Sequence, residues 1–271
     1  MLDFDPPLFN TIVLDQPEDG VLRLTVNRPD RMNSMTVEMF GEFRAATRAL
    51  RDSQARALIL TGAGDRAFCA GFDLAEIEVI TRMSVREFVR FEELAADSVA
   101  AIRALPFPVI AAVHGAAAGG GLSLALSADI RLASPAAKFS AAFVKVGLSA
   151  GELGTSWQLT RLIGPGRAAE MAYTARNVDA AEAHRIGLVN RVVPAEDLHD
   201  EAVALARTIA GNSPAGVRMS KRALQANMEV GSYAAAMELE NRGQSLLTRG
   251  ADMPEALAAF KDKRQPRFTG Q

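Results

Sequence analysis

The sequence predicts an α/β fold that continues into an all-helical C-terminal part. Between residues 57 and 133, short apolar stretches alternate with longer segments whose apolar residues recur at helical spacing. Glycine-rich turns at 62–64 and 119–121 separate strand from helix. Beyond Pro194 only the helical pattern recurs. Strands that alternate with helices are typical of an α/β fold, so these three observations give the fold class.

A β-hairpin is predicted at the start of the α/β part of the chain. Residues 11–16 and 21–26 alternate apolar and polar side chains on either side of the turn sequence Pro-Glu-Asp-Gly at 17–20. The next element is a helix that begins at Thr36, a residue type that caps helix N-termini, and ends near Arg51. Its apolar residues recur every three or four positions, so one face of this helix is expected to be buried.

Three further strands are expected at 57–61, 108–113 and 129–133. The first two are short apolar runs of the kind that is buried on both faces of a parallel sheet. A helix at 84–105 separates the first two strands, and a short helix at 122–128 follows a glycine-rich turn. These strands and helices are expected to form an α/β core.

The last part of the chain is predicted to contain helices only, and we place a domain boundary near residue 200. Residues 1–200 are expected to form the α/β core that holds the functional site. Residues 201–271 are expected to pack on their own core or on a neighbouring subunit, and so to serve oligomerisation. The predicted helices span 195–211, 214–230, 232–248 and 252–261.

Composition narrows the classes of function. The net charge of −2 argues against nucleic-acid binding, and the single cysteine, Cys69, excludes an intrachain disulfide and suits the reducing cytoplasm. The first ten residues carry Asp3 and Asp5 and no apolar run, so no signal peptide is expected. The apolar stretch 116–126 is too short to span a bilayer, and no residue cluster has metal-ligand spacing. We therefore expect a cytoplasmic protein with no membrane, nucleic-acid or metal partner.

The first candidate loop for a functional site is AFCAGFDL at 67–74, which follows the strand at 57–61. Asp73 is a typical N-cap for a short helix, and Glu76 stands at the spacing of a capping box. A backbone N–H at the start of a helix has no hydrogen-bond acceptor within that helix. Gly71 allows a tight turn and lets a ligand approach the backbone.

The second loop is HGAAAGGG at 114–121, between a strand and a helix. Its three consecutive glycines combine free N–H donors with the positive end of a helix dipole. Two such donors aimed at one oxygen make an oxyanion hole. Taken singly, a turn of this kind is more often structural or a phosphate site, but neither loop has the residue spacing of the known nucleotide-binding motifs.

Taken together, these segments resemble the crotonase superfamily, the enoyl-CoA hydratases and isomerases. The matching sequences are NRP at 27–29 with Asn33, AFCAGFDL at 67–74, PVIAAVHGAAAGGGLSLALSADIRLAS at 108–134 and AFKDKRQPRFTG at 259–270. The resemblance runs from about residue 11 to residue 270. It implies a crotonase-like spiral of ββα units with a helical C-terminal region, assembled as a homotrimer or a dimer of trimers.

The resemblance also implies which residues form the site. Phe72 and Gly120 would donate the two oxyanion-hole N–H groups to a thioester enolate. The substrate would be an acyl-CoA thioester, with no cofactor beyond its CoA moiety. The adenine of CoA would lie at the backbone of Ala70, Asp73 and Leu74, and the pantetheine near Arg31 and Met32. Phe260 and Lys263 would reach a CoA phosphate across a subunit boundary, although a basic run of this kind is otherwise a solvated helix end.

The sequence departs from the family pattern at the two glutamates that hydration uses. The first normally follows the middle glycine of the triplet by three residues, where this chain has Ser123. The second normally stands four residues after a phenylalanine that here is Phe139, and this chain has Phe143 there. Because neither side chain transfers a proton as a carboxylate does, we do not expect the usual two-glutamate mechanism.

One carboxylate remains close to this region. The loop 147–157 is one residue longer than in the common hydratases, and some relatives carry a functional aspartate near the place of Glu152. An apolar acyl pocket would raise the pKa of Glu152 by desolvation, which suits proton transfer near neutral pH. We interpret Glu152 as the acid/base. The alternative is an N-cap or surface carboxylate ahead of the helix at 155–163.

Three functions stay open at this point. The first is an enoyl-CoA hydratase or isomerase with Glu152 as its acid/base. The second is another crotonase-fold enzyme, such as a thioester hydrolase, a dehalogenase or a C–C lyase. The third is an acyl-CoA-binding protein without activity, which Ser123 and Phe143 motivate.

Overall fold

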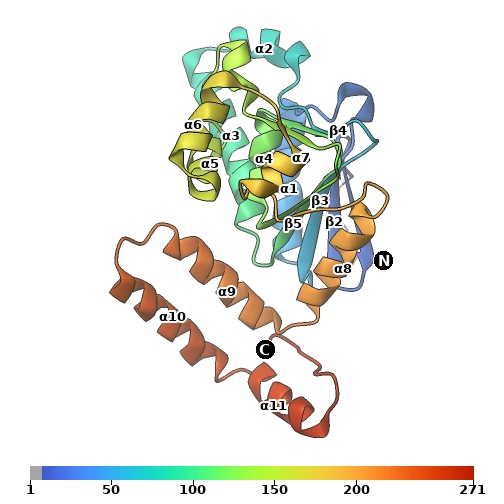
Figure 1. Ribbon diagram of the computed structural model, residues 1–271, viewed down its shortest axis with the longest axis vertical. Coiled ribbons are helices and arrows are strands. Elements are labelled where there is room, and N and C mark those ends of the chain that lie inside the picture. The colour runs from blue at the N-terminus through green and yellow to red at the C-terminus, as the bar shows by residue number, and fades with distance from the viewer. Residues whose placement is uncertain (1–7) are drawn as a thin grey trace.

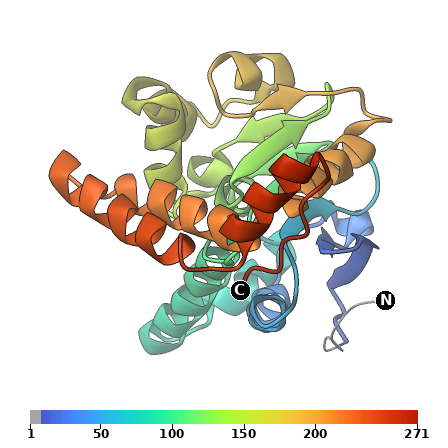
Figure 2. The same ribbon diagram turned by 90° about the horizontal axis from the view of Figure 1, so that it is seen from below.

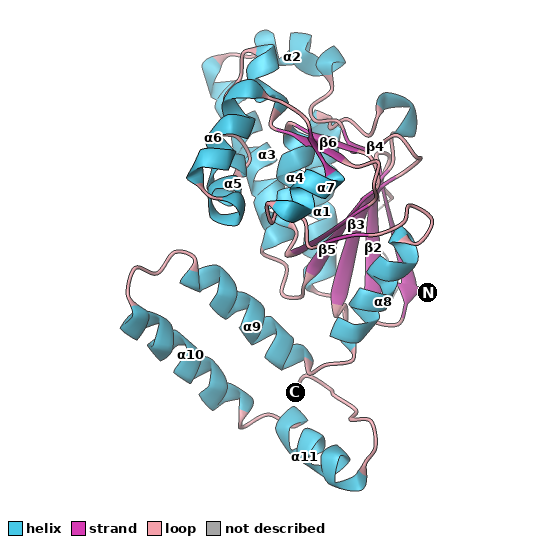
Figure 3. Ribbon diagram, in the orientation of Figure 1, coloured by secondary structure: helices cyan, strands magenta, loops and turns pink. Residues whose placement is uncertain are grey.

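Two β-sheets form the centre of the computed structural model, which describes residues 8–271 (Figures 1 and 3). Asp3 and Asp5, on which the argument against a signal peptide rests, lie outside the described residues. The strands are β1 Ile12–Glu18, β2 Val21–Val26, β3 Ala57–Gly62, β4 Ala67–Cys69, β5 Val109–Val113, β6 Ala116–Ala118, β7 Ile130–Ala133, β8 Lys138–Ser140, β9 Val178–Asp179 and β10 Arg191–Val192.

The chain enters the two sheets in turn. Within the described residues, one sheet has the order β1-β2-β3-β5-β7-β10 and the other has the order β4-β6-β8-β9. Thus β3, β5 and β7 each lie in the first sheet, and the strand that follows each of them, β4, β6 or β8, lies in the second. These strands pair in parallel, because helices carry the chain back between them. This spiral of ββα units confirms the predicted α/β fold class.

The helices surround the sheets and continue alone after the last strand. They are α1 Val37–Arg51, α2 Ile77–Thr81, α3 Val85–Arg103, α4 Gly120–Ser127, α5 Thr155–Ile163, α6 Pro165–Thr174, α7 Ala180–Arg185, α8 Leu198–Ala210, α9 Pro214–Asn227, α10 Tyr233–Leu247 and α11 Asp252–Asp262. No helix within residues 8–271 is long and apolar enough to cross a membrane.

Side chains cap the starts of α1 and α3, and the cap of α1 is the one that the sequence predicts. The Thr36 hydroxyl accepts a hydrogen bond from the Met39 N–H at 3.1 Å, as expected of an N-cap. Ser84 and Glu87 form a reciprocal capping box at the start of α3. The hairpin is also present, although β1 extends to Glu18 and leaves a shorter turn than predicted.

The glycine-rich turn differs from its prediction. The sequence predicts a continuous turn at 115–121 and a helix from Leu122, whereas the structure has strand β6 in this segment and begins α4 at Gly120. Glycine disfavours helix interiors, so the sequence places the helix start too late. Close packing requires glycine at position 121, because a Cβ on Gly121 would lie 1.9 Å from the Cys69 carbonyl oxygen.

Helix α8 belongs to the sheet rather than to the outlying helices. Its residues Leu198, Ala202 and Ala206 are buried against Ile59 and Ile110 of the larger sheet. Residue 200, where the sequence places a boundary, lies inside this helix. The helices that stand apart from the core in Figure 1 are α9, α10 and α11, and Figure 2 shows them from below, in front of the core.

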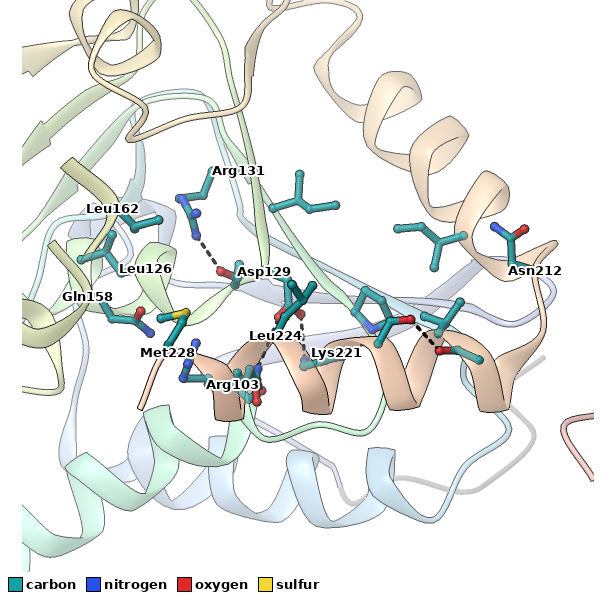
Figure 4. Close-up of a pocket in the computed structure, with 18 of the residues that line it drawn as sticks. Arg103, Leu126, Asp129, Arg131, Gln158, Leu162, Asn212, Lys221, Leu224 and Met228 are labelled. Atoms are coloured by element: carbon teal, nitrogen blue, oxygen red, sulfur yellow. Dashed lines mark hydrogen bonds and ion pairs between the residues drawn. The ribbon is translucent and has the colours of Figure 1, made fainter. Parts of the chain in front are cut away.

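A buried ion pair ties α9 to the core (Figure 4). The Lys221 ammonium lies 2.7 Å from the Asp129 carboxylate and donates to the Phe107 carbonyl at 2.9 Å. A cavity of about 860 Å³ opens beside this pair, between α9 and the core. Pro108 and Leu126 line it, so it adjoins the start of β5 and the end of α4. The glycine-rich loop is at the other end of β5 and of α4, away from this cavity.

Candidate active site

The first loop leaves one backbone donor free. The Met35 N–H donates to the Gly71 carbonyl at 2.7 Å, and the Asp73 N–H donates to the Met35 carbonyl at 2.8 Å. This parallel bridge uses the groups on either side of Phe72, so the N–H of Phe72 points to the opposite side. The Phe72 N–H donates to no group among the described residues.

The second loop leaves another donor free, next to the first. Gly120 is the first residue of α4, so its N–H has no acceptor within the helix, and within residues 8–271 it has none elsewhere. A Cβ on Gly71 would lie 2.8 Å from the Ala118 carbonyl oxygen and 3.5 Å from the Gly120 nitrogen. The structure therefore brings the two predicted donor loops into contact, with a glycine where they meet.

A turn from the N-terminal part supports the first loop. The Ala70 N–H donates to the Met32 carbonyl at 3.0 Å. The buried Asn33 amide donates to the carbonyls of Ala63 and Ala67 at 2.8 and 2.7 Å, and so fixes the turn to the strands. The residues predicted to contact CoA that lie at this junction are Arg31, Met32, Ala70, Asp73 and Leu74.

Asp73 is held by charge as well as by capping. The Arg28 guanidinium donates to the Asp73 carboxylate at 2.8 Å, and the Ala75 N–H donates to it at 3.0 Å, which confirms the predicted N-cap. Burial by itself would raise the pKa of Asp73, but hydrogen bonds from Ala75, Arg28 and Ser34 outweigh it and hold that pKa below its ordinary value of 3.8. The predicted capping box is wrong, because Glu76 instead accepts the Val37 N–H at 2.9 Å.

Replacing Arg28 by methionine is expected to lower the free energy of unfolding by about 2 kcal/mol at neutral pH, because Asp73 stays buried without its charged partner. The pKa of Asp73 is lowered in the folded state, so its contribution to stability is present above the unfolded pKa and is lost as the pH falls through the folded pKa. The difference between wild type and variant should therefore shrink below about pH 4.

Urea denaturation at neutral and at acidic pH measures both effects. The matched control is Arg31→Met, an exposed arginine of the same turn, which should leave the unfolding free energy unchanged. An equal loss at both pH values in the Arg28 variant would contradict the role given to Asp73.

Glu152 stands in a turn that touches the second loop. Leu153, with a φ of +47°, places its Cδ1 3.5 Å from the position that a Cβ on Gly120 would take. Burial and the Glu92 carboxylate raise the pKa of the half-buried Glu152 to about 7. Helix α5 is capped by Gly154 and receives no side-chain hydrogen bond there, so the N-cap alternative for Glu152 is wrong.

Glu92 of α3 affects the pKa of Glu152, and the sequence argument did not single it out. It follows Phe91 on α3, whose ring packs against that of Phe72 with a centroid distance of 5.7 Å. Its signal was present: Glu92 stands four residues after Phe88 and three before the buried Ala95, so it interrupts the apolar stripe of the helix. Burying an unpaired charge is unfavourable, so a glutamate within such a stripe indicates a polar or charged partner nearby.

The positions of the usual glutamates are filled by packed side chains. Ser123 is 1% exposed and shares a hydrogen bond of 2.5 Å with the Thr155 hydroxyl. Phe143 is also buried. Burial raises the pKa of the nearby Cys69 thiol to about 12, so this cysteine is not a thiolate nucleophile at neutral pH.

Two of the residues that are predicted to contact CoA lie far from this site in the same chain. Phe260 and Lys263 stand at the end of α11, which Figure 1 shows well below α4 and α2. The Phe260 side chain is 86% exposed. Their predicted role requires a second subunit, so it stays a prediction.

Similarity to known proteins identifies the family. A model of the enoyl-CoA hydratase/isomerase family matches residues 16–271. The chain belongs to this family. The crystal structure of an enoyl-CoA hydratase from Bacillus anthracis has a TM-score of 0.91 at 33% identity, over 97% of this chain and 100% of that one. The crotonase-superfamily resemblance is thereby confirmed.

Named members of the enoyl-CoA hydratase/isomerase family differ in reaction. A probable enoyl-CoA hydratase of Mycobacterium tuberculosis is 42% identical over 268 residues, which are 95% of this chain and 92% of that protein. The 1,2-epoxyphenylacetyl-CoA isomerase of Escherichia coli is 39% identical over 267 residues, 96% of this chain and 98% of that protein. Because family members with both types of name match at least 95% of the chain, the choice of reaction rests on the site itself.

Proposed function

We propose that the protein is an enoyl-CoA isomerase that moves one proton between the α and γ carbons of an acyl-CoA thioester. The observation that carries this proposal is the meeting of two free backbone donors, of Phe72 and Gly120, with a turn that holds Glu152. The pKa of Glu152, about 7, suits a group that both takes and returns a proton at neutral pH.

The proposed reaction has two steps. The Glu152 carboxylate removes a proton from the α carbon of a 3-enoyl thioester, and the electron pair delocalises onto the thioester oxygen. The N–H groups of Phe72 and Gly120 donate to this oxygen as its negative charge grows, which lowers the barrier. Glu152 then delivers the same proton to the γ carbon, the double bond moves to the α,β position, and the carboxylate is restored.

Hydration is less well supported by these side chains. It requires one group to activate water and a second to protonate the α carbon. The buried Ser123 and Phe143 occupy the places where the resemblance puts those two groups, and neither is a carboxylate.

We also propose how CoA and a second subunit complete the site. CoA is expected along the junction of the turn at Met32 with the loop at Ala70, where backbone groups of both segments meet. A homotrimer or dimer of trimers is expected, because large side chains of the last helices are exposed, among them Tyr233, Leu246 and Phe260. Across such a boundary Phe260 and Lys263 would reach the CoA of a neighbour.

A panel of CoA thioesters tests the proposal. A 3-enoyl-CoA, a 2-enoyl-CoA and a saturated acyl-CoA are each incubated with the protein, and products are separated and weighed by mass spectrometry. We expect the 3-enoyl ester to become the 2-enoyl ester with no change of mass. Addition of water to the 2-enoyl ester alone, or release of free CoA, would replace isomerisation by hydration or hydrolysis. Calorimetric binding with no product from any ester would indicate a protein without activity.

A further inference from the structure

A buried pair of hydroxyl groups joins two elements of the proposed site. The Ser123 Oγ lies 2.5 Å from the Thr155 Oγ1. Ser123 stands on α4, three residues after Gly120, and Thr155 is the first residue of α5, three residues after Glu152. The two residues are 1% and 0% exposed, so bulk water does not compete for their hydrogen bond. The pair therefore links the helix of the proposed donor to the turn of the proposed acid/base.

On α4, Ser123 contacts the peptide group that carries the proposed donor. The Ser123 N–H donates to the Gly119 carbonyl at 3.1 Å, and the Ser123 hydroxyl lies 3.4 Å from the same oxygen. This carbonyl and the Gly120 N–H belong to one planar trans peptide unit, so they point in opposite directions. Whatever holds the Gly119 carbonyl therefore also sets the direction of the Gly120 N–H.

On α5, Thr155 closes the turn that carries Glu152. The Thr155 N–H donates to the Glu152 carbonyl at 2.8 Å. Within the same turn, the Leu153 Cδ1 lies 3.5 Å from the position that a Cβ on Gly120 would take. No side chain among the described residues caps the start of α5, so the Thr155 hydroxyl serves the bond to Ser123 and not a helix cap. The hydroxyl of Thr155 thus holds this turn against α4.

We infer that Ser123 and Thr155 are positioning residues for the proposed reaction. Their hydroxyl pair sets the Gly120 N–H and the turn of Glu152 in one fixed arrangement, so that both groups reach the same thioester. When the Thr155 hydroxyl donates to Ser123, the Ser123 hydroxyl is free to donate to the Gly119 carbonyl. This inference rests on the proposed function, and neither hydroxyl takes up or releases a proton in it.

Two physical effects favour this arrangement. A donor to the Gly119 carbonyl polarises the peptide group, which makes the Gly120 N–H a stronger donor to the enolate oxygen. A fixed distance between donor and base also matters, because a displacement of about 1 Å can cost on the order of 10²-fold in rate. The resemblance places a hydration glutamate at position 123, whereas the short side chain of Ser123 is bonded to Thr155 instead. The position thus has a different role in this chain.

The test is the turnover of a 3-enoyl-CoA by variants that lack one hydroxyl. Ser123→Ala and Thr155→Val each remove one partner of the pair and nearly keep the shape of the side chain. Each should lower kcat by roughly 10- to 100-fold, because the donor and the base lose their fixed arrangement. KM should change by less than about threefold, since neither hydroxyl is proposed to contact CoA. Thr155→Ser retains the hydroxyl and should restore kcat to within a few-fold of wild type.

The double variant separates positioning from packing. Ser123→Ala combined with Thr155→Val contains neither buried hydroxyl, so its loss of stability in urea denaturation should be smaller than the two single losses added. Its kcat should nevertheless stay as low as in the single variants, because the link is missing in all three. If the pair only served packing, kcat would instead recover together with stability.

The matched control is Ser127→Ala on the same helix. Ser127 is also buried, one turn further along α4, and its hydroxyl donates to the Leu124 carbonyl at 2.7 Å. This variant removes a buried hydroxyl from α4 without touching the link to α5. Its kcat should therefore equal that of the wild type.

The outcomes distinguish this inference from the proposed function. A wild-type kcat in Ser123→Ala, or a Thr155→Ser variant as slow as Thr155→Val, would overturn the role of the hydroxyl pair even if Glu152→Gln is inactive. Full turnover in Glu152→Gln would instead overturn the proposed function. If Thr155→Val does not fold, Ser123→Ala and its control Ser127→Ala still decide.

Discussion

Replacing Glu152 by glutamine is expected to lower kcat by about 10³-fold, because a positioned acid/base contributes roughly 10² to 10⁴ to the rate. Glutamine has nearly the shape of glutamate but takes up no proton at neutral pH. The packing of Leu153 on Gly120 should survive, since the turn is defined by the backbone of the two following residues. The loss should therefore appear in kcat rather than in the stability of the protein.

Two measurements separate chemistry from binding in this variant. Calorimetry with a saturated acyl-CoA should give an affinity within a few-fold of wild type, since Glu152 is proposed to act on a proton and not on CoA. Exchange of the α proton of that ester in deuterated water reports the first step alone, and it should fall as far as kcat does. The matched control is Glu93→Gln, which changes an exposed glutamate. Undiminished exchange in the Glu152 variant would contradict its role.

Long periodic elements, capped helices and the strands β3, β5 and β7 were predictable, while strand β6 was not. The helix from Thr36 to Arg51 has its cap and its buried face in local sequence, and the structure agrees. Strand β6 has three alanines and no alternation, so only its pairing with β4 and β8 makes it a strand. Sequence patterns report local periodicity, and the second sheet is formed by non-local pairing.

The site likewise has some features that the sequence predicts and others that depend on tertiary packing. The proposed donors Phe72 and Gly120 stand in loops with a strong sequence signature, and their approach through Gly71 follows from adjacent parallel strands. The pKa of Glu152 is raised in part by Glu92, which stands 60 positions away in the sequence, on a helix that shares no motif with the turn. Glu92 was visible only as a charge within an apolar stripe, and its partner is a matter of tertiary packing.

Replacing Gly120 by proline is expected to lower kcat by about 10²- to 10³-fold, the usual effect of losing one oxyanion-hole donor. Gly120 is the first residue of α4, a position where proline is well tolerated because the missing N–H has no helical partner. Gly119, with φ +52° and ψ −124°, has the mirror image of an extended backbone, which glycine adopts freely ahead of a proline. The variant thus removes the proposed donor and keeps the helix.

The matched control is Gly120→Ala, which adds a Cβ and retains the N–H. That Cβ would lie 3.2 Å from the Met35 sulfur and 3.5 Å from a methyl of Leu153, both at the ends of flexible side chains. The ratio of kcat between the alanine and proline variants therefore measures the loss of the N–H group together with the ring Cδ that takes the place of its hydrogen. Calorimetry with a saturated ester shows how far the ring Cδ by itself weakens binding, because the negative charge on the oxygen develops only as the proton leaves. Equal kcat values in two folded variants would mean that the Gly120 N–H does not hold the enolate oxygen.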